Sequence, residues 1–294
     1  MLVSFYGVRG TIAAPGSSTA RYGGNTSCVH VRTNRGADYA FDAGTGLRPL
    51  GDQLFSGTTP ITLLVTHGHW DHIHGLPFFA PIHQRDRDIR VFAPEHSRES
   101  VLAQINGHNF PLNLAMLPAN LHNIDDPEAS ATADQLRLTR KALNHPGGGW
   151  AYKLEEEGAS IAYVTDNELD PPYAQTTRYE QWIEYLKGVD VLIHDSQYRE
   201  SDMPAKHGWG HSLISQVRKL ALDAQIGTLV IYHHDPMRTD AELDEVRIES
   251  EQYFRGKGAR TNVLIAFEGL SLDIAPRASG KPAKLSVLSS SRPL

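Results

Sequence analysis

Short apolar runs alternate with amphipathic segments along most of the chain. The run Ile61–Val65 is almost continuously apolar, which is typical of a strand buried on both faces. Ser212–Ala224 instead has the apolar spacing of a helix with one buried face. The pattern predicts strands over Leu2–Val8, Ser27–Thr33, Asp38–Asp42, Ile61–Val65, Ile89–Ala93, Leu136–Leu143, Trp150–Glu155, Ser160–Thr165, Val189–His194, Thr228–Tyr232 and Asn262–Phe267, and helices from Ser97 to about Ile105 and over Arg178–Lys187, Ser212–Ala224 and Asp240–Phe254.

The order of these elements predicts the fold class. Each half of the chain begins with strands joined by turns and continues with strands that alternate with helices. This order favours an α/β protein in which two sheets pack together and helices lie outside them, as four layers. We expect one domain over residues 1–275 and, because the sequence then becomes rich in Ser, Pro and Lys, a C-terminal tail over 276–294. The apolar but aperiodic stretch 106–118 is interpreted as a loop that packs on the core, covers a substrate or contacts a second copy.

Composition narrows the class of protein. The single cysteine, Cys28, excludes an internal disulfide and a cysteine-based zinc finger, and its place in a strand predicts an inert buried thiol. No segment approaches 18 consecutive apolar residues, so we expect a cytoplasmic protein with no membrane partner. The formal net charge of −6 argues against an extended surface for nucleic-acid polymers. The 15 histidines are an unusual number and direct attention to metal binding or titration.

The main candidate chemistry lies directly after the buried run Ile61–Val65. Residues 66–72 read THGHWDH, which places the pattern H-x-H-x-D-H at the carboxyl end of a strand. Loops beyond strand ends are where α/β folds place their sites. Neutral imidazoles and a carboxylate suit Zn²⁺, Mn²⁺ or Fe. Four such side chains within six residues cannot all face one ion, so the spacing favours two neighbouring metal ions.

This loop and four further motifs, taken in order, resemble those of the metallo-β-lactamase superfamily. The further motifs are FDAGTG at 41–46, NHPGG at 144–148, YVTD at 163–166 and LVIYHH at 229–234. The resemblance covers most of the chain and implies the metallo-β-lactamase fold, a four-layered αββα sandwich of two mixed β-sheets flanked by helices. It also implies a ligand set in which the first metal is held by His67, His69 and His145, the second by Asp71, His72 and His233, and Asp166 lies between them.

Two neighbours of these motifs receive roles through the same resemblance. His234 follows His233 directly and is the alternative ligand at that strand end. Asp42 lies in the turn that resembles the family's Asp-x-Gly motif, which implies that it orients a ligand histidine from behind.

Two N-terminal segments and one later segment resemble the phosphodiesterase branch of the superfamily, which includes tRNase Z and cyclic-nucleotide phosphodiesterases. The relevant segments are GVRGTI at 7–12, RYGGNTSC at 21–28 and HGWGHS at 207–212. In that branch a histidine at such a helix start contacts the scissile phosphate, which implies this role for His211; a simple capping or surface histidine is the alternative. Only 20 residues separate His145 from Asp166, which leaves no room for the long arm with which tRNase Z-like enzymes hold tRNA.

We therefore expect a dinuclear metal-dependent phosphodiesterase that hydrolyses a small phosphodiester, with a 3′,5′-cyclic nucleotide as the favoured substrate. Catalysis is assigned to Asp71 and His211, with attack by a metal-bridging hydroxide, and the expected cofactors are two divalent ions, zinc before manganese or iron. Related phosphodiesterases imply a homodimer. The alternatives are an RNA-processing nuclease of the tRNase Z type, a thioester or lactone hydrolase of the same fold, and a sensor that binds the metals without useful turnover.

Overall fold

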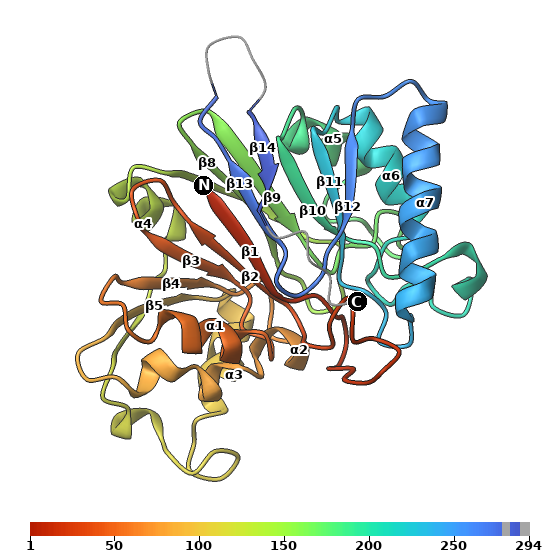
Figure 1. The fold of residues 1–294 in the computed structure, drawn as a ribbon. Coiled ribbons are helices and arrows are strands. Elements are labelled where there is room, and N and C mark those ends of the chain that lie inside the picture. Colours follow the sequence, from red (N-terminus) through yellow and green to blue (C-terminus); the bar gives the residue numbers. More distant parts are fainter. Residues whose placement is uncertain (278–282, 289–294) are drawn as a thin grey trace.

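Two β-sheets pack face to face, and helices cover their outer faces (Figure 1). The structure is a computed structural model that describes residues 1–277 and 283–288. Within these residues the first sheet has eight strands. Their spatial order is β14 (Leu285–Val287), β13 (Ser271–Ile274), β1 (Leu2–Gly7), β2 (Cys28–Arg32), β3 (Asp38–Phe41), β4 (Ile61–Leu64), β5 (Asp88–Phe92) and β6 (Asn120–Asn123).

The second sheet has six strands within the same described ranges. Their spatial order is β12 (Asn262–Ile265), β11 (Thr228–Tyr232), β10 (Val191–Asp195), β9 (Ala159–Val164), β8 (Trp150–Glu156) and β7 (Arg137–Ala142). Both sheets are mixed, because β3 to β6 and β9 to β12 pair in parallel while the other strands pair antiparallel.

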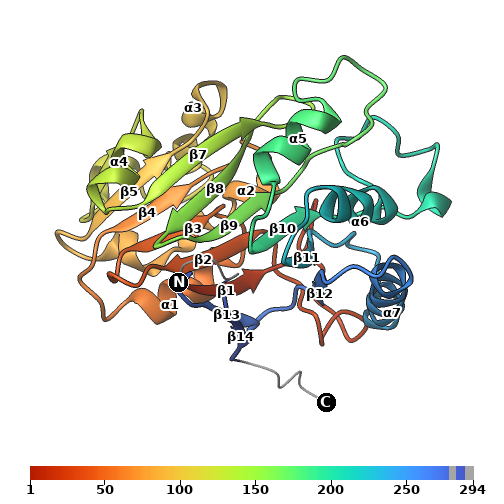
Figure 2. The ribbon, with the colours of Figure 1, turned by 90° about the horizontal axis from the view of Figure 1, so that it is seen from above.

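Helices form the two outer layers, as the view from above shows (Figure 2). On the side of the first sheet lie α1 (Leu47–Leu54), α2 (Trp70–Ile73) and α3 (Glu95–Ala103), with short 3₁₀ turns at Leu76–Phe78, Ala80–His83 and Leu114–Met116. On the side of the second sheet lie α5 (Tyr179–Leu186), α6 (Ile214–Asp223) and α7 (Asp240–Gly256), with a 3₁₀ turn at Glu200–Asp202. The short helix α4 (Pro127–Ala133) contacts β7.

The interface between the sheets is a hydrophobic core rich in aromatic side chains. Phe41 of β3 stacks on Tyr163 of β9 and on Tyr152 of β8, with ring centroids 5.1 and 5.8 Å apart. All three rings are fully buried. Offset stacking of this kind contributes beyond the burial of apolar area, so these rings fix how the two sheets lie on one another.

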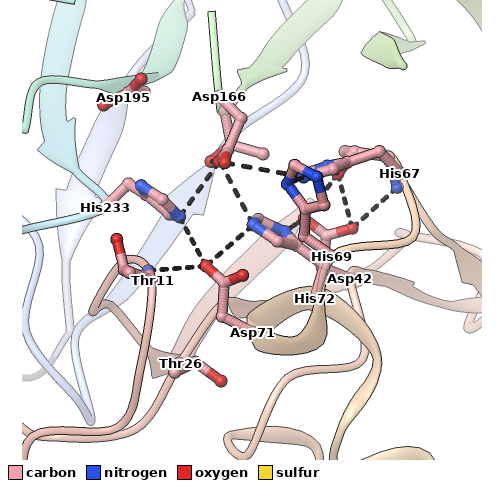
Figure 3. A network of polar contacts seen from close by, with 12 residues as sticks. Thr11, Thr26, Asp42, His67, His69, Asp71, His72, Asp166, Asp195 and His233 are labelled. Atoms are coloured by element: carbon pink, nitrogen blue, oxygen red, sulfur yellow. Dashed lines mark hydrogen bonds and ion pairs between the residues drawn. The ribbon is translucent and has the colours of Figure 1, made fainter. Parts of the chain in front are cut away.

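Strand direction determines where functional side chains gather. Because β9, β10 and β11 are parallel, their carboxyl ends meet at one edge of the second sheet. Asp166 and His233 follow β9 and β11 there, and Asp195 is the last residue of β10. The loop that follows β4 of the first sheet brings the predicted H-x-H-x-D-H motif to the same edge (Figure 3).

The structure confirms the predicted four-layered arrangement of two mixed sheets and outer helices. Helix starts differ from those predicted. The helix predicted from Ser97 begins at Glu95, because the Pro94 carbonyl already accepts the amides of Ser97 and Arg98. The helix predicted from Ser212 begins at Ile214, because the Ser212 hydroxyl donates to the Asn167 carbonyl instead of capping the helix.

The division into a domain over 1–275 and a tail over 276–294 stays a prediction. Part of that tail, 278–282 and 289–294, lies outside the described residues. Leu285–Val287 form β14, which pairs with β13 at the edge of the first sheet. None of the helices in the described ranges has the length and apolar character needed to cross a membrane.

Candidate metal centre

Side chains from distant parts of the chain converge where the two sheets meet at their carboxyl edge (Figure 3). They form two groups of possible metal ligands that share Asp166, and a third possible group, Asp195, His211 and His233, shares His233 with the second. The contributing positions are His67 and His69 after β4, Asp71 and His72 in α2, His145 between β7 and β8, Asp166 after β9 and His233 after β11.

The first group consists of three imidazoles and one carboxylate oxygen. The Nε2 atoms of His67 and His145 lie 2.9 and 3.0 Å from Nδ1 of His69. Asp166 Oδ2 lies 3.6 Å from Nε2 of His67 and 3.7 Å from Nε2 of His145. His69 is exposed while the other three side chains are buried, so this group opens to solvent on the His69 side.

The second group uses the other oxygen of the same carboxylate. Asp166 Oδ1 lies 3.2 Å from His72 Nε2 and 3.0 Å from His233 Nε2. The Oδ2 atom of Asp71 lies 3.1 and 3.2 Å from the same two imidazole nitrogens. Asp166 therefore directs one oxygen to each group, which is the arrangement of a carboxylate that bridges two ions.

The donor atoms fit a divalent metal ion. Ligand atoms at ordinary zinc distances in a tetrahedral site are about 3.3 Å apart, and the contacts above lie on either side of that value. His72 Nε2 is buried and has no hydrogen-bond partner, although carboxylate oxygens lie on both sides of it. A buried polar atom without a partner is costly, and a cation between these groups removes that cost. The fold and the two groups together define a divalent metal site.

In three of the imidazoles, the second ring nitrogen is held by a partner behind the ring. His72 Nδ1 donates to Asp42 at 2.7 Å, and His145 Nδ1 donates to the Gly210 carbonyl at 3.0 Å. His233 Nδ1 donates to the side-chain oxygen of Gln197 at 3.0 Å. Such partners fix the tautomer and orientation of metal-binding histidines. The position predicted for Asp42, behind a histidine of the motif, agrees with this contact.

The backbone is strained at several of these positions. Asp42, Asp166 and His233 have φ values of 61°, 52° and 57°, in the left-handed region that residues with a Cβ rarely adopt. Thr11, whose amide donates to Asp71 at 2.7 Å, has a φ of 66°. Each such residue costs about 1–3 kcal/mol and persists only where the surroundings hold it, typically at functional sites.

Burial keeps two of the imidazoles neutral. It lowers the pKa of His145 to about 4, against the opposing effect of the Asp166 carboxylate. It also lowers the pKa of His67 well below its ordinary value, and the neighbouring His72 adds to this effect. Neutral imidazoles have a free lone pair at pH 7, as a metal ligand requires.

In contrast to His67 and His145, His211 has a raised pKa. Its Nδ1 lies 3.1 Å from Asp195 Oδ2, and its ring stacks against His233 with centroids 5.3 Å apart. Burial alone would lower the pKa of His211, but the Asp195 carboxylate, with help from Asp166, raises it to about 9. A protonated imidazole beside a metal site can contact a phosphate oxygen and donate a proton.

The structure brings together all the residues that the sequence analysis assigned to the site. His233, and not its neighbour His234, faces Asp71 and Asp166; His234 Nε2 donates to the Ala266 carbonyl. Sequence reasoning missed Thr11, Gln197 and Glu168, which hold these side chains or the loop beside them. Glu168 holds the loop that contains Gly208, Trp209 and Gly210. The two glycines on either side of Trp209 were the feature of the sequence that could have indicated this tight loop.

Comparison with known proteins identifies the class and the family. Residues 39–234 match the model of the Beta-lactamase superfamily domain. The chain is 23% identical over 264 aligned positions to ribonuclease Z of Thermoplasma acidophilum, which covers 74% of this chain and 84% of that relative. It is 26% identical over 314 positions to ribonuclease Z of Haloarcula marismortui, which covers 92% and 96%.

Two solved structures share the fold. One is the metallo-β-lactamase fold protein YhfI from Bacillus subtilis, with a TM-score of 0.65, 16% identity and coverage of 92% of this chain and 99% of that one. The other is the short form of human tRNase Z, with a TM-score of 0.59, 17% identity and coverage of 95% and 100%. The fold and the divalent metal site define a metal-dependent hydrolase. The chain belongs to the metallo-β-lactamase superfamily, as the sequence resemblance implied.

The prediction of a small phosphodiester as the partner, with extended nucleic acid unlikely, was wrong. The relatives that match most of the chain are named ribonuclease Z, so they act on RNA. The net charge of −6 misled because it averages over the whole surface and counts no bound metal ion. Two divalent ions held by these residues would make the local field positive at the site in spite of the negative net charge.

Proposed function

We propose that this protein is a metal-dependent phosphodiesterase that cleaves RNA, of the ribonuclease Z type. The observation that carries the proposal is the shared Asp166 carboxylate, with one oxygen toward each ligand group and the His211–Asp195 pair beside it. A two-ion centre next to a proton donor suits in-line displacement at phosphorus. The names of the relatives favour RNA as the source of that phosphodiester.

Each ligand group would hold one divalent ion. His67, His69, His145 and Asp166 Oδ2 form the first set, and Asp71, His72, His233 and Asp166 Oδ1 the second. Imidazoles with carboxylates favour zinc, and manganese or iron also suit this donor set. When bound, the ions supply a nucleophile at neutral pH and neutralise charge on the phosphoryl oxygens.

The side chains around the ions would complete the reaction. Asp71 accepts the amide of Thr11 through Oδ2, which fixes its carboxylate among the residues that line the pocket, where it would orient the attacking water. His211 contacts the scissile phosphate and donates a proton to the leaving ribose oxygen. Asp195 keeps that proton on His211 until it is needed. A general acid of this kind contributes roughly 10²–10⁴-fold when the leaving group is a poor one.

The His211–Asp195 pair is also what favours phosphodiester chemistry over thioester or lactone hydrolysis. Thioester and lactone hydrolases use the same metal-binding loop. Their substrates carry no phosphate at the reacting centre, so they need no cationic side chain beside the metal ions. A cytoplasmic location and a homodimer stay predictions.

The test is cleavage of a structured precursor RNA by zinc- or manganese-loaded protein. We expect defined cleavage that is abolished by a chelator and by Asp71→Asn, and reduced roughly 10²–10⁴-fold by His211→Ala with the metal content unchanged. His122→Ala is the control, because His122 is an exposed histidine of β6 that lies outside the candidate ligand groups. Hydrolysis of an activated diester such as bis-p-nitrophenyl phosphate without any RNA cleavage would refute RNA as the substrate.

A further inference from the structure

Two tryptophan side chains are exposed at the mouth of the metal pocket. Trp70 is 61% and Trp209 60% exposed, although indole is among the most costly side chains to leave in water. Both line one cavity of about 330 Å³, together with Asp166 and His211. They reach this cavity from opposite sheets, Trp70 from α2 and Trp209 from the loop before α6.

The loop that carries Trp209 is built to hold it in place. Gly208 and Gly210 both donate their amides to the carboxylate of buried Glu168, at 2.8 and 2.9 Å. Both glycines have a positive φ, 88° and 89°. A Cβ on Gly210 would lie 2.1 Å from Nδ1 of His145, so only glycine allows the loop to approach this ligand so closely.

The position of Trp70 is fixed by its neighbours in sequence. It stands between the candidate ligands His69 and Asp71, so the backbone on either side of it is held by the metal centre. Its ring meets His74 edge to face, with centroids 5.1 Å apart. Neither tryptophan therefore owes its exposure to a loosely held segment, and both are presented next to the reacting centre.

Two cations near the cavity, Lys206 and Arg238, are already engaged. Lys206 pairs with Asp235 at 2.6 Å, and Arg238 pairs with Asp202 at 3.1 Å. The chain as a whole also has a net charge of −6. The rim of the cavity therefore offers an RNA strand exposed aromatic rings, and little unpaired positive charge. Stacking on aromatic side chains is available to every base and needs no such charge.

We infer that Trp70 and Trp209 are substrate-binding residues that stack the unpaired bases of the nucleotides flanking the scissile phosphate. This inference rests on the proposed function, because it takes RNA as the polymer whose phosphate enters the pocket. It makes the enzyme selective for single-stranded RNA at the cleavage point, since a base within a duplex is not free to stack on an indole.

Stopped-flow anisotropy of a fluorescein-labelled oligoribonucleotide records binding to the metal-loaded protein before turnover. Abasic residues, placed in turn at each position around the cleavage point, remove one base while keeping every phosphate. For the wild-type protein we expect the loss of a flanking base to weaken binding roughly 5- to 150-fold. Trp70→Ala and Trp209→Ala should weaken binding of intact RNA within the same range and remove the penalty for the abasic residue that each one stacks.

Matched variants separate stacking from folding. Trp70→Phe and Trp209→Phe keep an aromatic face and should restore part of the affinity. Phe55→Ala removes an exposed aromatic ring that does not line the cavity and should change nothing. The inference is overturned if wild-type protein binds intact and abasic RNA equally, or if both alanine variants bind intact RNA as tightly as the wild type, as they would if the tryptophans face a partner protein instead.

Cleavage of the intact RNA is scored in the same samples and tests the proposed function separately. Base-dependent binding without cleavage supports the stacking role and refutes the nuclease. Cleavage of RNA by a protein whose binding does not depend on the flanking bases supports the nuclease and refutes the stacking role. Absence of both binding and cleavage overturns both.

Discussion

Asp195 Oδ2 lies 3.1 Å from Nδ1 of His211, and both side chains are buried beside the shared carboxylate of Asp166. This contact is the main reason that the pKa of His211 is raised to about 9 in spite of its burial. His211 is then protonated at neutral pH and loses its proton as the pH rises through that value. A reaction that needs His211 as an acid must therefore slow down when the pH exceeds this pKa.

Asp195→Asn should therefore move the alkaline limb of the pH–rate profile to lower pH. Loss of a carboxylate at this distance shifts the pKa of its partner by roughly 1–3 pH units. The measurement is the rate of RNA cleavage from pH 6 to pH 10, with metal content checked at each end. A limb that stays in place in Asp195→Asn would show that His211 is not the group responsible for it.

Asp42 is predicted to control metal affinity without touching a metal. It accepts hydrogen bonds from His72 Nδ1, from the amide and hydroxyl of Thr66 and from the hydroxyl of Tyr163. Asp42→Asn should weaken zinc binding roughly 10- to 100-fold, because the supporting partner of a ligand histidine is lost. Competition with a chromophoric chelator measures the affinity. Tyr163→Phe removes one donor to the same carboxylate and should have a much smaller effect; equal affinity in Asp42→Asn and wild type would remove Asp42 from the metal centre.

RNA binding should depend weakly on salt. The cations near the pocket are paired with carboxylates, so few counterions are released when RNA binds. We expect the logarithm of the binding constant to fall with the logarithm of salt concentration at a slope of roughly −2 or shallower, where 6–10 phosphate contacts would give roughly −4 to −9. Binding titrations between 50 and 200 mM KCl measure this slope. A steep slope would contradict the prediction and would mean that a cationic surface elsewhere on the molecule binds the RNA.

Cys28 should be chemically inert in the folded protein. Burial, with a smaller contribution from Asp42, raises the pKa of its thiol well above the ordinary value, so almost no thiolate forms near neutral pH. Iodoacetamide at pH 8 should leave native Cys28 unmodified and should alkylate it fully in 8 M urea, as mass spectrometry can follow. Alkylation of the native protein at the rate of a free cysteine would mean that β2 opens readily.

The candidate ligands were predictable because they follow strands that the sequence makes recognisable. Ile61–Val65 and Thr228–Tyr232 are apolar runs, and the polar residues directly after them can only lie at strand ends. The parallel pairing of β9, β10 and β11 then brings Asp166, Asp195 and His233 to one edge. Each motif is local in the sequence. The motifs form one site because the parallel strands end at the same edge of the sheet.

Other features were not predictable because they depend on contacts between distant segments. Gln197 supports His233, and Glu168 holds the loop of Trp209, yet nothing in the sequence near either residue marks it for that role. The edge strand β6 (Asn120–Asn123) has no apolar periodicity and was missed for that reason. The proposed RNA substrate was hidden as well, since the formal charge of the chain omits any ions that its histidines would hold.

The most direct test of the central claim is the chemical nature of the ends that RNA cleavage produces. Attack by water at phosphorus breaks one phosphorus–oxygen bond, so one fragment must carry a free hydroxyl and the other a phosphomonoester. Attack by the neighbouring 2′-hydroxyl of the RNA would leave a 2′,3′-cyclic phosphate and needs no attacking water. Mass spectrometry of the fragments made by metal-loaded protein should show a hydroxyl and a phosphomonoester, and cleavage should survive a single 2′-deoxy substitution at the scissile position. Cyclic phosphate ends, or intact RNA after incubation with protein that carries its metal ions, would contradict the account.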